Sequence, residues 1–195
     1  LVVPGGAAWG RQRIDNLVDA AKGMGSKGLL WMRLSGGAVQ SPLAKHLGEE
    51  GCRAILAALM AGPDDLALIV ADRFKPALSV LGALRLQIAR AEKWIDPSKH
   101  HMLWVHEFPL FEHSDEEGRL VACHHPFTSP LPADLARLES DPGAVRAAAY
   151  DLVLDGTEIG GGSIRIHRSD VQERVFQMLG MGREEGMTKV LFEKD

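Results

Sequence analysis

The stretch YDLVLDGTEIGGGSIRI, residues 150–166, decides the fold of the second half of this chain. Two runs with strand-type residues flank Asp155 and Gly156, and Asp-Gly in that setting is among the strongest local signals for a two-residue β-hairpin loop. The predicted cross-strand pairs are Leu154 with Thr157, Val153 with Glu158, and Asp151 with Gly160. The stretch therefore predicts an antiparallel ribbon with a fixed register.

This register brings two carboxylates together. Side chains alternate between the two faces of a strand, so Asp151 and Glu158 share one face, diagonally across the ladder, with roughly 7–8 Å between their backbones. Two carboxylates at that separation can share a hard cation, and Mg²⁺ bound partly through substrate phosphates is the usual case. The alternative is that both carboxylates simply face water.

A glycine run follows the second carboxylate, at positions Gly160, Gly161 and Gly162. Three glycines weaken a strand, so they indicate either a ligand that approaches the backbone closely or a bulge. Strict alternation places Arg165 on the face opposite Glu158, and Arg165 reaches the carboxylate face only if a bulge occurs within 160–163. On that face, Arg165 would either form a structural ion pair with the two acids or bind a substrate carboxylate through two hydrogen bonds.

The segment HHPFTSP, residues 124–130, carries two adjacent imidazoles. Pro126 and Pro130 stiffen it, because each fixes its own φ angle and restricts the residue before it. A stiff loop with His124 and His125 at its start could close over a ligand. The alternative is a surface loop whose histidines point into water.

Periodicity divides the chain into two parts near residue 98. Apolar residues at helical spacing predict helices at 11–25, 41–47, 49–62 and 76–94. On the last of them the inward-facing residues are expected to be Leu78, Leu81, Leu84 and Ile88. Strand-length apolar runs occupy 29–34 and 66–72. We expect this alternation to form a small α+β or α/β unit.

The second part has a different composition. Strand-like runs occupy 102–111 and 119–125, a polar helix or loop spans 131–148, and a helix capped by Ser169 and stopped by Gly180 follows the ribbon. We therefore predict an α+β protein with domains at 1–98 and 99–195. The four tryptophans are expected to pack in cores or between domains: Trp9, Trp31, Trp94 and Trp104.

Net charge, cysteine content and the lengths of apolar runs limit which classes of protein this chain can belong to. A net charge of −4 gives no global attraction to nucleic acid, so an RNA partner would need local patches. Two cysteines far apart favour a reducing, cytoplasmic setting. No apolar run approaches the ~20 residues that span a bilayer, so no membrane partner is expected. The chain lacks an initiator Met, and we expect it to be a piece of a longer protein.

The motifs together resemble the bacterial-type aspartyl-tRNA synthetases, a class II family. HHPFTSP, LWVHEFPLF and YDLVLDGTEIGGGSIRI carry the resemblance to the middle of the catalytic domain, over about 102–180. VPGG, GSKGLLW, SPLAKHL and LGALRLQIA resemble the GAD domain inserted into it, over about 5–98. The resemblance implies a GAD-like α/β domain followed by part of a class II antiparallel sheet with flanking helices.

The resemblance also implies a reaction and its residues. Such enzymes activate L-aspartate with ATP to aspartyl-adenylate and transfer it to tRNA(Asp), or also to tRNA(Asn), usually as homodimers. It assigns Asp151 and Glu158 to Mg²⁺, and Arg165 to the side-chain carboxylate of aspartate. His124 would contact the amino acid from a mobile loop that also holds His125. The adenylate site would comprise Glu158, Gly160, Gly161, Gly162 and Arg165.

The chain differs from the family pattern in several missing motifs and at two positions of the hairpin. Motifs 1, 2 and 3 and the anticodon-binding barrel are not in this sequence, so we expect the isolated chain to be inactive. Thr157 stands where the family has tyrosine, and Asp155 stands where asparagine is common. Two alternatives remain: a non-catalytic, tRNA-binding GAD module like that of an amidotransferase subunit, and a synthetase-like paralogue with another acceptor.

Overall fold

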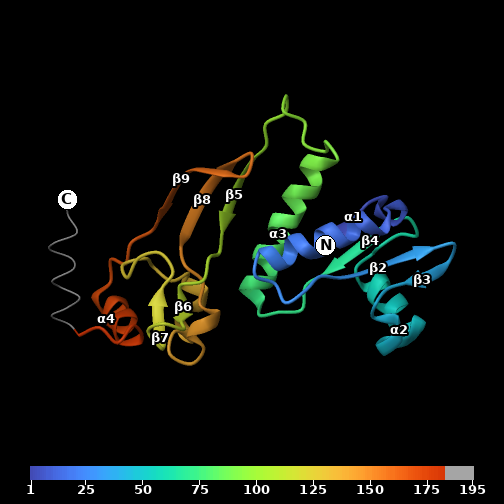
Figure 1. Ribbon diagram of the computed structural model, residues 1–195. Coiled ribbons are helices and arrows are strands. Elements are labelled where there is room, and N and C mark those ends of the chain that lie inside the picture. The colour runs from blue at the N-terminus through green and yellow to red at the C-terminus, as the bar shows by residue number, and fades with distance from the viewer. Residues whose placement is uncertain (183–195) are drawn as a thin grey trace. The chain divides into compact units, whose positions relative to one another are not determined.

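The computed structural model describes residues 1–182 and forms two compact units, one spanning Leu1–Asp96 and one that starts at Pro97 (Figure 1). The remaining residues of the predicted second domain, 183–195, lie outside the described residues. Helices and antiparallel sheets occur together in the chain, as the predicted α+β class requires. Among the described residues, no helix is both long enough and apolar enough to cross a membrane.

The first unit is built on a four-stranded antiparallel sheet. Its strands, in spatial order, are β1 (Val2–Val3), β4 (Leu66–Ile69), β2 (Leu30–Ser35) and β3 (Ala38–Gln40). The runs at 29–34 and 66–72 were predicted as strands. The two short edge strands were not, because two or three residues give no periodic signal.

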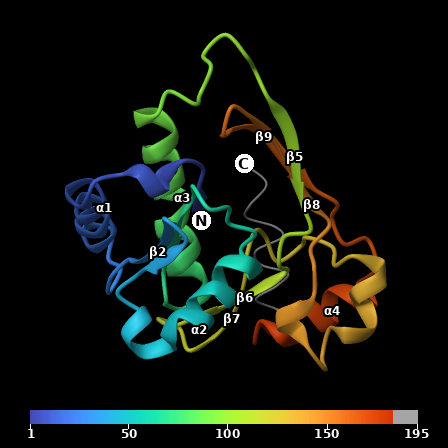
Figure 2. The same ribbon diagram turned by 90° about the vertical axis from the view of Figure 1, so that its right-hand side faces the viewer.

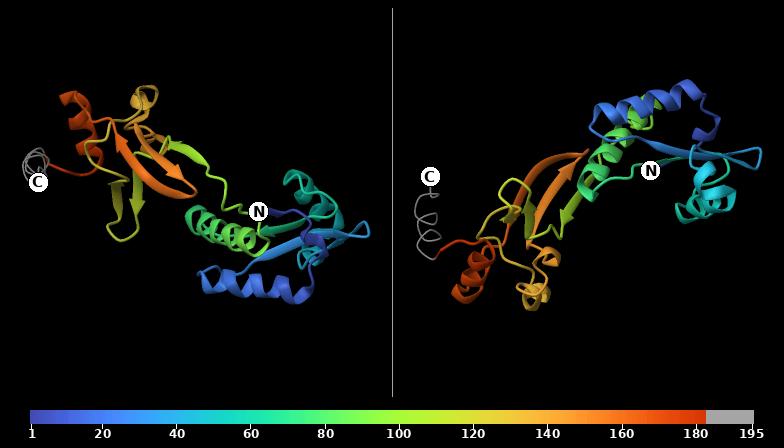
Figure 3. Two further views of the ribbon diagram at one scale, coloured as in Figure 1. Left: turned by 90° about the horizontal axis from the view of Figure 1, so that it is seen from above. Right: turned by 60° about the horizontal axis from the view of Figure 1, so that its bottom comes forward.

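Helices cover this sheet on both faces. α1 (Arg11–Gly23) and α3 (Phe74–Ala91) pack on one face, and α2 (Ala44–Ala58) packs on the other (Figure 3). Neighbouring strand residues serve opposite layers, as the pleat requires: Trp31 contacts the α1–α3 layer, and Met32 contacts the α2 layer. The sheet is therefore the middle of three layers.

The two helices predicted at 41–47 and 49–62 are confirmed as two helical segments of α2, which a kink at Gly48 separates. The φ of 68° and ψ of 173° of Gly48 are not helical. In α3, Leu84 and Ile88 are buried as predicted and Leu81 is half-buried, but Leu78 is 53% exposed. The residue that faces the core near the start of the helix is Val80 instead.

The second unit contains a three-stranded antiparallel sheet of β5 (Met102–His106), β8 (Ala149–Leu154) and β9 (Thr157–Ser163), in that order (Figure 2). A separate hairpin pairs β6 (Phe111–Ser114) with β7 (Arg119–Ala122). The run predicted at 102–111 thus splits in two, and Glu107, with a φ of 61°, lies at the break. The polar segment after HHPFTSP contains two short 3₁₀ helices, η2 (Pro132–Arg137) and η3 (Pro142–Ala144).

The core of the second unit lies at one end of this sheet. It joins the β6–β7 hairpin, the start of β8 and α4 (Ser169–Met178) through Phe111, Leu138, Ala149 and Val175. Ser169 is the first residue of α4 and caps nothing, so its predicted capping role is wrong. Gly180, with a φ of 67°, follows the helix as predicted.

Most of β5 lies away from this core. Trp104 is 60% exposed, and Trp94 in the first unit is 50% exposed, so neither belongs to the core of its own unit. Trp31 is buried as predicted. Trp9 is partly buried against the core of the first unit.

Candidate functional site

The β8–β9 hairpin has the two-residue turn that its sequence predicts. Asp155 and Gly156 have φ angles of 51° and 83°, and two positive φ angles are what the twist-compatible type I′ turn requires. Leu154 pairs with Thr157, and Val153 pairs with Glu158. Local turn chemistry therefore fixes the register at this end of the ribbon.

Beyond these two pairs the register shifts by one residue. Leu152 pairs with Gly160 and Asp151 pairs with Gly161, so Ile159 is the extra residue of a β-bulge. The predicted pairing of Asp151 with Gly160 is wrong for this reason. The bulge also lies one residue before the 160–163 window in which it was expected. A bulge reverses the face to which all following residues point.

The bulge places Gly161 directly beneath the two carboxylates. A Cβ atom on Gly161 would collide with Oδ1 of Asp151 and lie 3.1 Å from Oε1 of Glu158. Both carboxylates therefore lie on the same face and converge over this glycine, which we call the carboxylate face. A side chain at position 161 would force the Asp151 carboxylate to shift.

The other two glycines point to the opposite face. A Cβ on Gly162 would lie 2.9 Å from the hydroxyl oxygen of Tyr150, whereas a Cβ on Gly160 would meet nothing within 4 Å. Tyr150 in turn makes an edge-on contact with Trp104, at 5.9 Å between ring centroids. The glycine run thus serves two faces of the ribbon.

Arg165 shares the carboxylate face. Its backbone forms an antiparallel bridge with Thr128, and residues directly opposite each other point the same way. The hydroxyl of Thr128 reaches that of Ser163 at 3.3 Å, and Ser163 follows Gly161 by two residues. The bulge at Ile159 therefore reverses the alternation of side chains, so that Arg165 lies on the same face of the ribbon as Asp151 and Glu158.

The second half of HHPFTSP is part of this ladder. The Ser129 N–H donates to the Ile164 carbonyl, and the Ile166 N–H donates to the Phe127 carbonyl, both at 2.8 Å. The Ala148 N–H donates to the Ser129 carbonyl at 2.8 Å. Backbone hydrogen bonds therefore hold residues 127–129, and any lid movement would be limited to residues around His124 and His125.

The two histidines have different surroundings. His125 accepts the Phe127 N–H on its Nδ1 at 3.2 Å, and its ring lies 4.8 Å from that of Phe127. His124 is exposed, with its ring 4.7 Å from that of Phe108. His125 is therefore held within its own turn, and His124 is the more accessible of the two.

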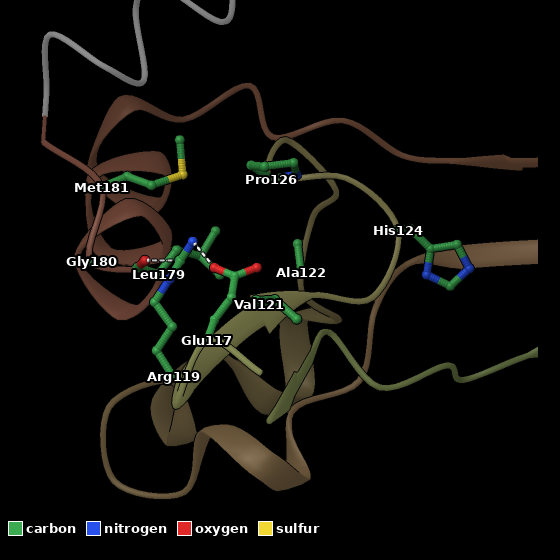
Figure 4. Close-up of a pocket in the computed structure, with 9 residues that line it drawn as sticks. All are labelled: Glu117, Arg119, Val121, Ala122, His124, Pro126, Leu179, Gly180 and Met181. Atoms are coloured by element: carbon green, nitrogen blue, oxygen red, sulfur yellow. Dashed lines mark hydrogen bonds and ion pairs between the residues drawn. The ribbon is translucent and has the colours of Figure 1, made fainter. Parts of the chain in front are cut away.

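His124 also borders a pocket of about 390 Å³ between β7 and the end of α4 (Figure 4). Within it, Arg119 donates to the Leu179 carbonyl at 2.7 Å and pairs with Glu117. The other lining residues are Val121, Ala122, Pro126, Gly180 and Met181. None of the carboxylate-face residues lines this pocket, so the structure does not unite His124 with them in one cavity.

An ion-pair cluster around the buried Asp134 was not predicted from the sequence. Asp134, whose side chain is 5% exposed, accepts hydrogen bonds from Nε of Arg146 at 2.8 Å and from its backbone N–H at 3.0 Å. Nη1 of Arg146 lies 3.1 Å from Oε1 of Glu107. The hydrogen bonds from Arg146 lower the pKa of Asp134 to about 2. Asp134 and Arg146 belong to the segment predicted as a polar helix or loop, and Glu107 belongs to the run predicted at 102–111. Only the tertiary fold brings the three together.

Asp151 and Glu158 bring two oxygen-donor groups to one face of the ribbon. Among residues 1–182, no group of three or more His, Cys, Asp or Glu side chains could hold a metal ion by itself. Mg²⁺ commonly takes one or two protein carboxylates and completes its octahedron with water and substrate phosphates. Asp151 and Glu158 fit that ligand set.

The family model for class II tRNA synthetases (D, K and N) matches residues 15–192. This chain belongs to that family. It is 50% identical over 190 residues to an aspartate–tRNA(Asp/Asn) ligase of Caldanaerobacter subterraneus, covering 97% of this chain and 32% of the relative. It is 49% identical over 183 residues to an aspartate–tRNA ligase of Agathobacter rectalis, covering 93% and 31%.

A third relative matches the whole chain. The aspartate–tRNA(Asp/Asn) ligase of Moorella thermoacetica is 47% identical over 195 residues, which is 100% of this chain and 32% of that protein. The chain therefore spans about a third of the length of these curated relatives. The resemblance drawn from the motifs is confirmed. The GAD-like character of the first unit and the roles of the individual site residues stay predictions.

Proposed function

We propose that the full-length protein to which this chain belongs is an aspartate–tRNA ligase. It would activate L-aspartate with ATP to aspartyl-adenylate and then transfer aspartate to tRNA. The observation that carries the proposal is the convergence of Asp151 and Glu158 over Gly161, on the face that also holds Arg165. The family match and the names of the relatives support it.

The carboxylate pair would bind the ATP part of the substrates through Mg²⁺. Asp151 and Glu158 would bind Mg²⁺ on the ATP phosphates, and Mg²⁺ when bound would supply charge neutralisation there. Gly161 gives the two carboxylates room to converge. Gly160 and Gly162 would leave the adjoining backbone open to the adenylate.

Arg165 would bind the amino acid substrate. Its planar fork of donors suits bidentate binding of the aspartate side-chain carboxylate. His124 would contact the amino acid, with His125 shaping the turn next to it. Since His124 borders a separate pocket, this contact would require a movement of residues 124–126.

The chemistry needs little covalent help from the protein. The α-carboxylate of aspartate would attack the α-phosphorus of ATP, and pyrophosphate would leave in line. The residues of the carboxylate face would contribute by positioning the two reactants and by neutralising charge.

The partners follow from this activity. We expect tRNA(Asp) as acceptor, and tRNA(Asn) as a second one, because two of the relatives are named aspartate–tRNA(Asp/Asn) ligases. A homodimer and a cytoplasmic location belong to the same proposal. The isolated chain, without motifs 1, 2 and 3, is expected to be inactive.

The test is aspartate-dependent ATP–pyrophosphate exchange by the full-length protein. Arg165→Leu should lower kcat/KM for aspartate by about 10³-fold or more, because the substrate carboxylate loses its paired donors. Arg168→Leu is a matched control, since this exposed arginine pairs with Asp170 instead. Normal use of aspartate by Arg165→Leu would refute the binding of the substrate carboxylate by Arg165. ATP–pyrophosphate exchange by the isolated chain would refute the prediction that the isolated chain is inactive.

The alternatives make different predictions. A non-catalytic GAD module would account for the first unit alone, but the family match continues through residue 192. A paralogue would form aspartyl-adenylate and leave tRNA uncharged. Aspartylation of tRNA(Asp) by the full-length protein separates the ligase from the paralogue.

A further inference from the structure

Thr128 and Ser163 form a hydroxyl pair at the edge of the carboxylate face. Thr128 is 1% exposed, and its Oγ1 lies within hydrogen-bond distance, 3.3 Å, of Oγ of the half-buried Ser163. The backbone of Thr128 also forms the bridge to Arg165. The pair therefore links HHPFTSP to the strand that carries the proposed aspartate clamp.

Ser163 lies between the two ends of the proposed site. At about 3.3 Å rise per residue, its Cα is about 7 Å from those of Gly161 and Arg165. Alternation places all three on the same face. A small amino acid that is held by Arg165 and reaches a phosphate over Gly161 would therefore extend across Ser163.

The hydroxyl pair leaves Ser163 able to donate to a ligand. A serine hydroxyl has one proton and two lone pairs, and its proton rotates to suit its partners. When Thr128 donates across the 3.3 Å contact, a lone pair of Ser163 is used and its proton is available to a ligand. A carboxylate has acceptor sites only, so an anionic substrate group suits this position.

We propose that Ser163 donates a hydrogen bond to a carboxylate of the amino acid substrate beside Arg165. Thr128 is the positioning residue, which acts by fixing the rotamer of Ser163. This inference rests on the proposed function and adds to it a substrate contact and the residue that orients it. It also gives the Thr of HHPFTSP a purpose that neither a lid nor a surface loop supplies.

The experiment measures ATP–pyrophosphate exchange by the full-length protein with aspartate and ATP varied separately. Ser163→Ala should raise KM for aspartate about tenfold, the usual effect of losing one hydrogen bond to a charged group, and change KM for ATP by less than about twofold. Thr128→Val should act in the same direction, and Thr128→Ser should restore the wild-type value. Ser129→Ala is the matched control, because its hydroxyl bonds to the Pro130 carbonyl.

Three results would overturn the inference: an unchanged KM for aspartate in Ser163→Ala, an equal rise of both KM values, or no rescue by Thr128→Ser. A wild-type protein without aspartate-dependent exchange would refute the proposed function itself. If the wild type is active, Arg165→Leu is inactive and Ser163→Ala is normal, then only the role of Ser163 is refuted.

Discussion

The two sheets of this chain differ in what surrounds them. The β1–β4–β2–β3 sheet has a hydrophobic layer on each face, and Leu66, Ala67 and Leu68 of its strand β4 are fully buried. The β5–β8–β9 sheet leaves Leu103 and Trp104 more than half exposed. Packing explains the residues of the first sheet. It does not explain the acids and glycines of the second, which therefore call for a role in binding.

The largest effect should separate the two sheets by stability. Leu68→Ala in the covered sheet removes a fully buried side chain and should cost about 2–5 kcal/mol of unfolding free energy. Leu103→Ala, at a position that is 53% exposed, should cost less than about 1 kcal/mol. Urea unfolding of both variants measures the difference. Equal losses would mean that the two sheets are equally covered.

The next effect contrasts two neighbouring glycines on the open sheet. Gly161→Ala places a Cβ against both carboxylates and should lower ATP–pyrophosphate exchange by about 10²-fold or more. Gly160→Ala meets nothing within 4 Å and should change the activity little. Similar losses in both variants would contradict the assignment of faces and the position of the bulge.

A smaller effect should appear in the pH dependence of stability. Arg146 lowers the pKa of Asp134 from 3.8 to about 2 in the folded protein. A lowered pKa means that the ionised carboxylate stabilises the fold above pH 3.8 and that this contribution is lost as pH falls towards 2. Asp134→Asn should therefore lower the thermal midpoint by several degrees at pH 6, with the difference shrinking towards pH 2. A difference that is constant over this range would refute the ion pair.

The smallest effect concerns the tip of the ribbon. The carboxylate of Asp155 accepts the His101 N–H and contacts Nδ1 of His100, both at 2.7 Å. These two contacts lower the pKa of Asp155, with His100 the larger cause. Asp155→Ala should speed hydrogen exchange of the His101 amide, whereas Asp155→Asn keeps the acceptor and should speed it less. Equal exchange rates of the His101 amide in both variants would contradict a hydrogen bond from this amide to the Asp155 side chain.

The sequence predicted those features of the fold that depend on local chemistry. Asp155 and Gly156 specify the turn, and apolar runs and periodicity specify the main helices and the two central strands, β2 and β4, of the first unit. The bulge at Ile159 could not be placed, because a glycine run permits one at several positions and only the packed ladder selects among them. This single residue determines whether Arg165 lies on the carboxylate face.

Contacts between distant segments were beyond sequence reasoning. Asp134, Arg146 and Glu107 show no common sequence pattern, and only the folded chain brings them together around the buried Asp134. The exposure of Trp104 was missed for a related reason, since aromatic composition predicts burial only when the neighbouring elements are known. The carboxylate pair was found because its two members belong to one hairpin.

The most direct test of the account is a double-mutant cycle on Asp151 and Glu158 in the full-length protein. Its readout is the Mg²⁺ dependence of ATP–pyrophosphate exchange. If both carboxylates hold one cation, then Asp151→Asn combined with Glu158→Gln should lose little more activity than the worse single variant. Losses that multiply in the double variant would show that the two carboxylates act independently, and would contradict a shared metal site.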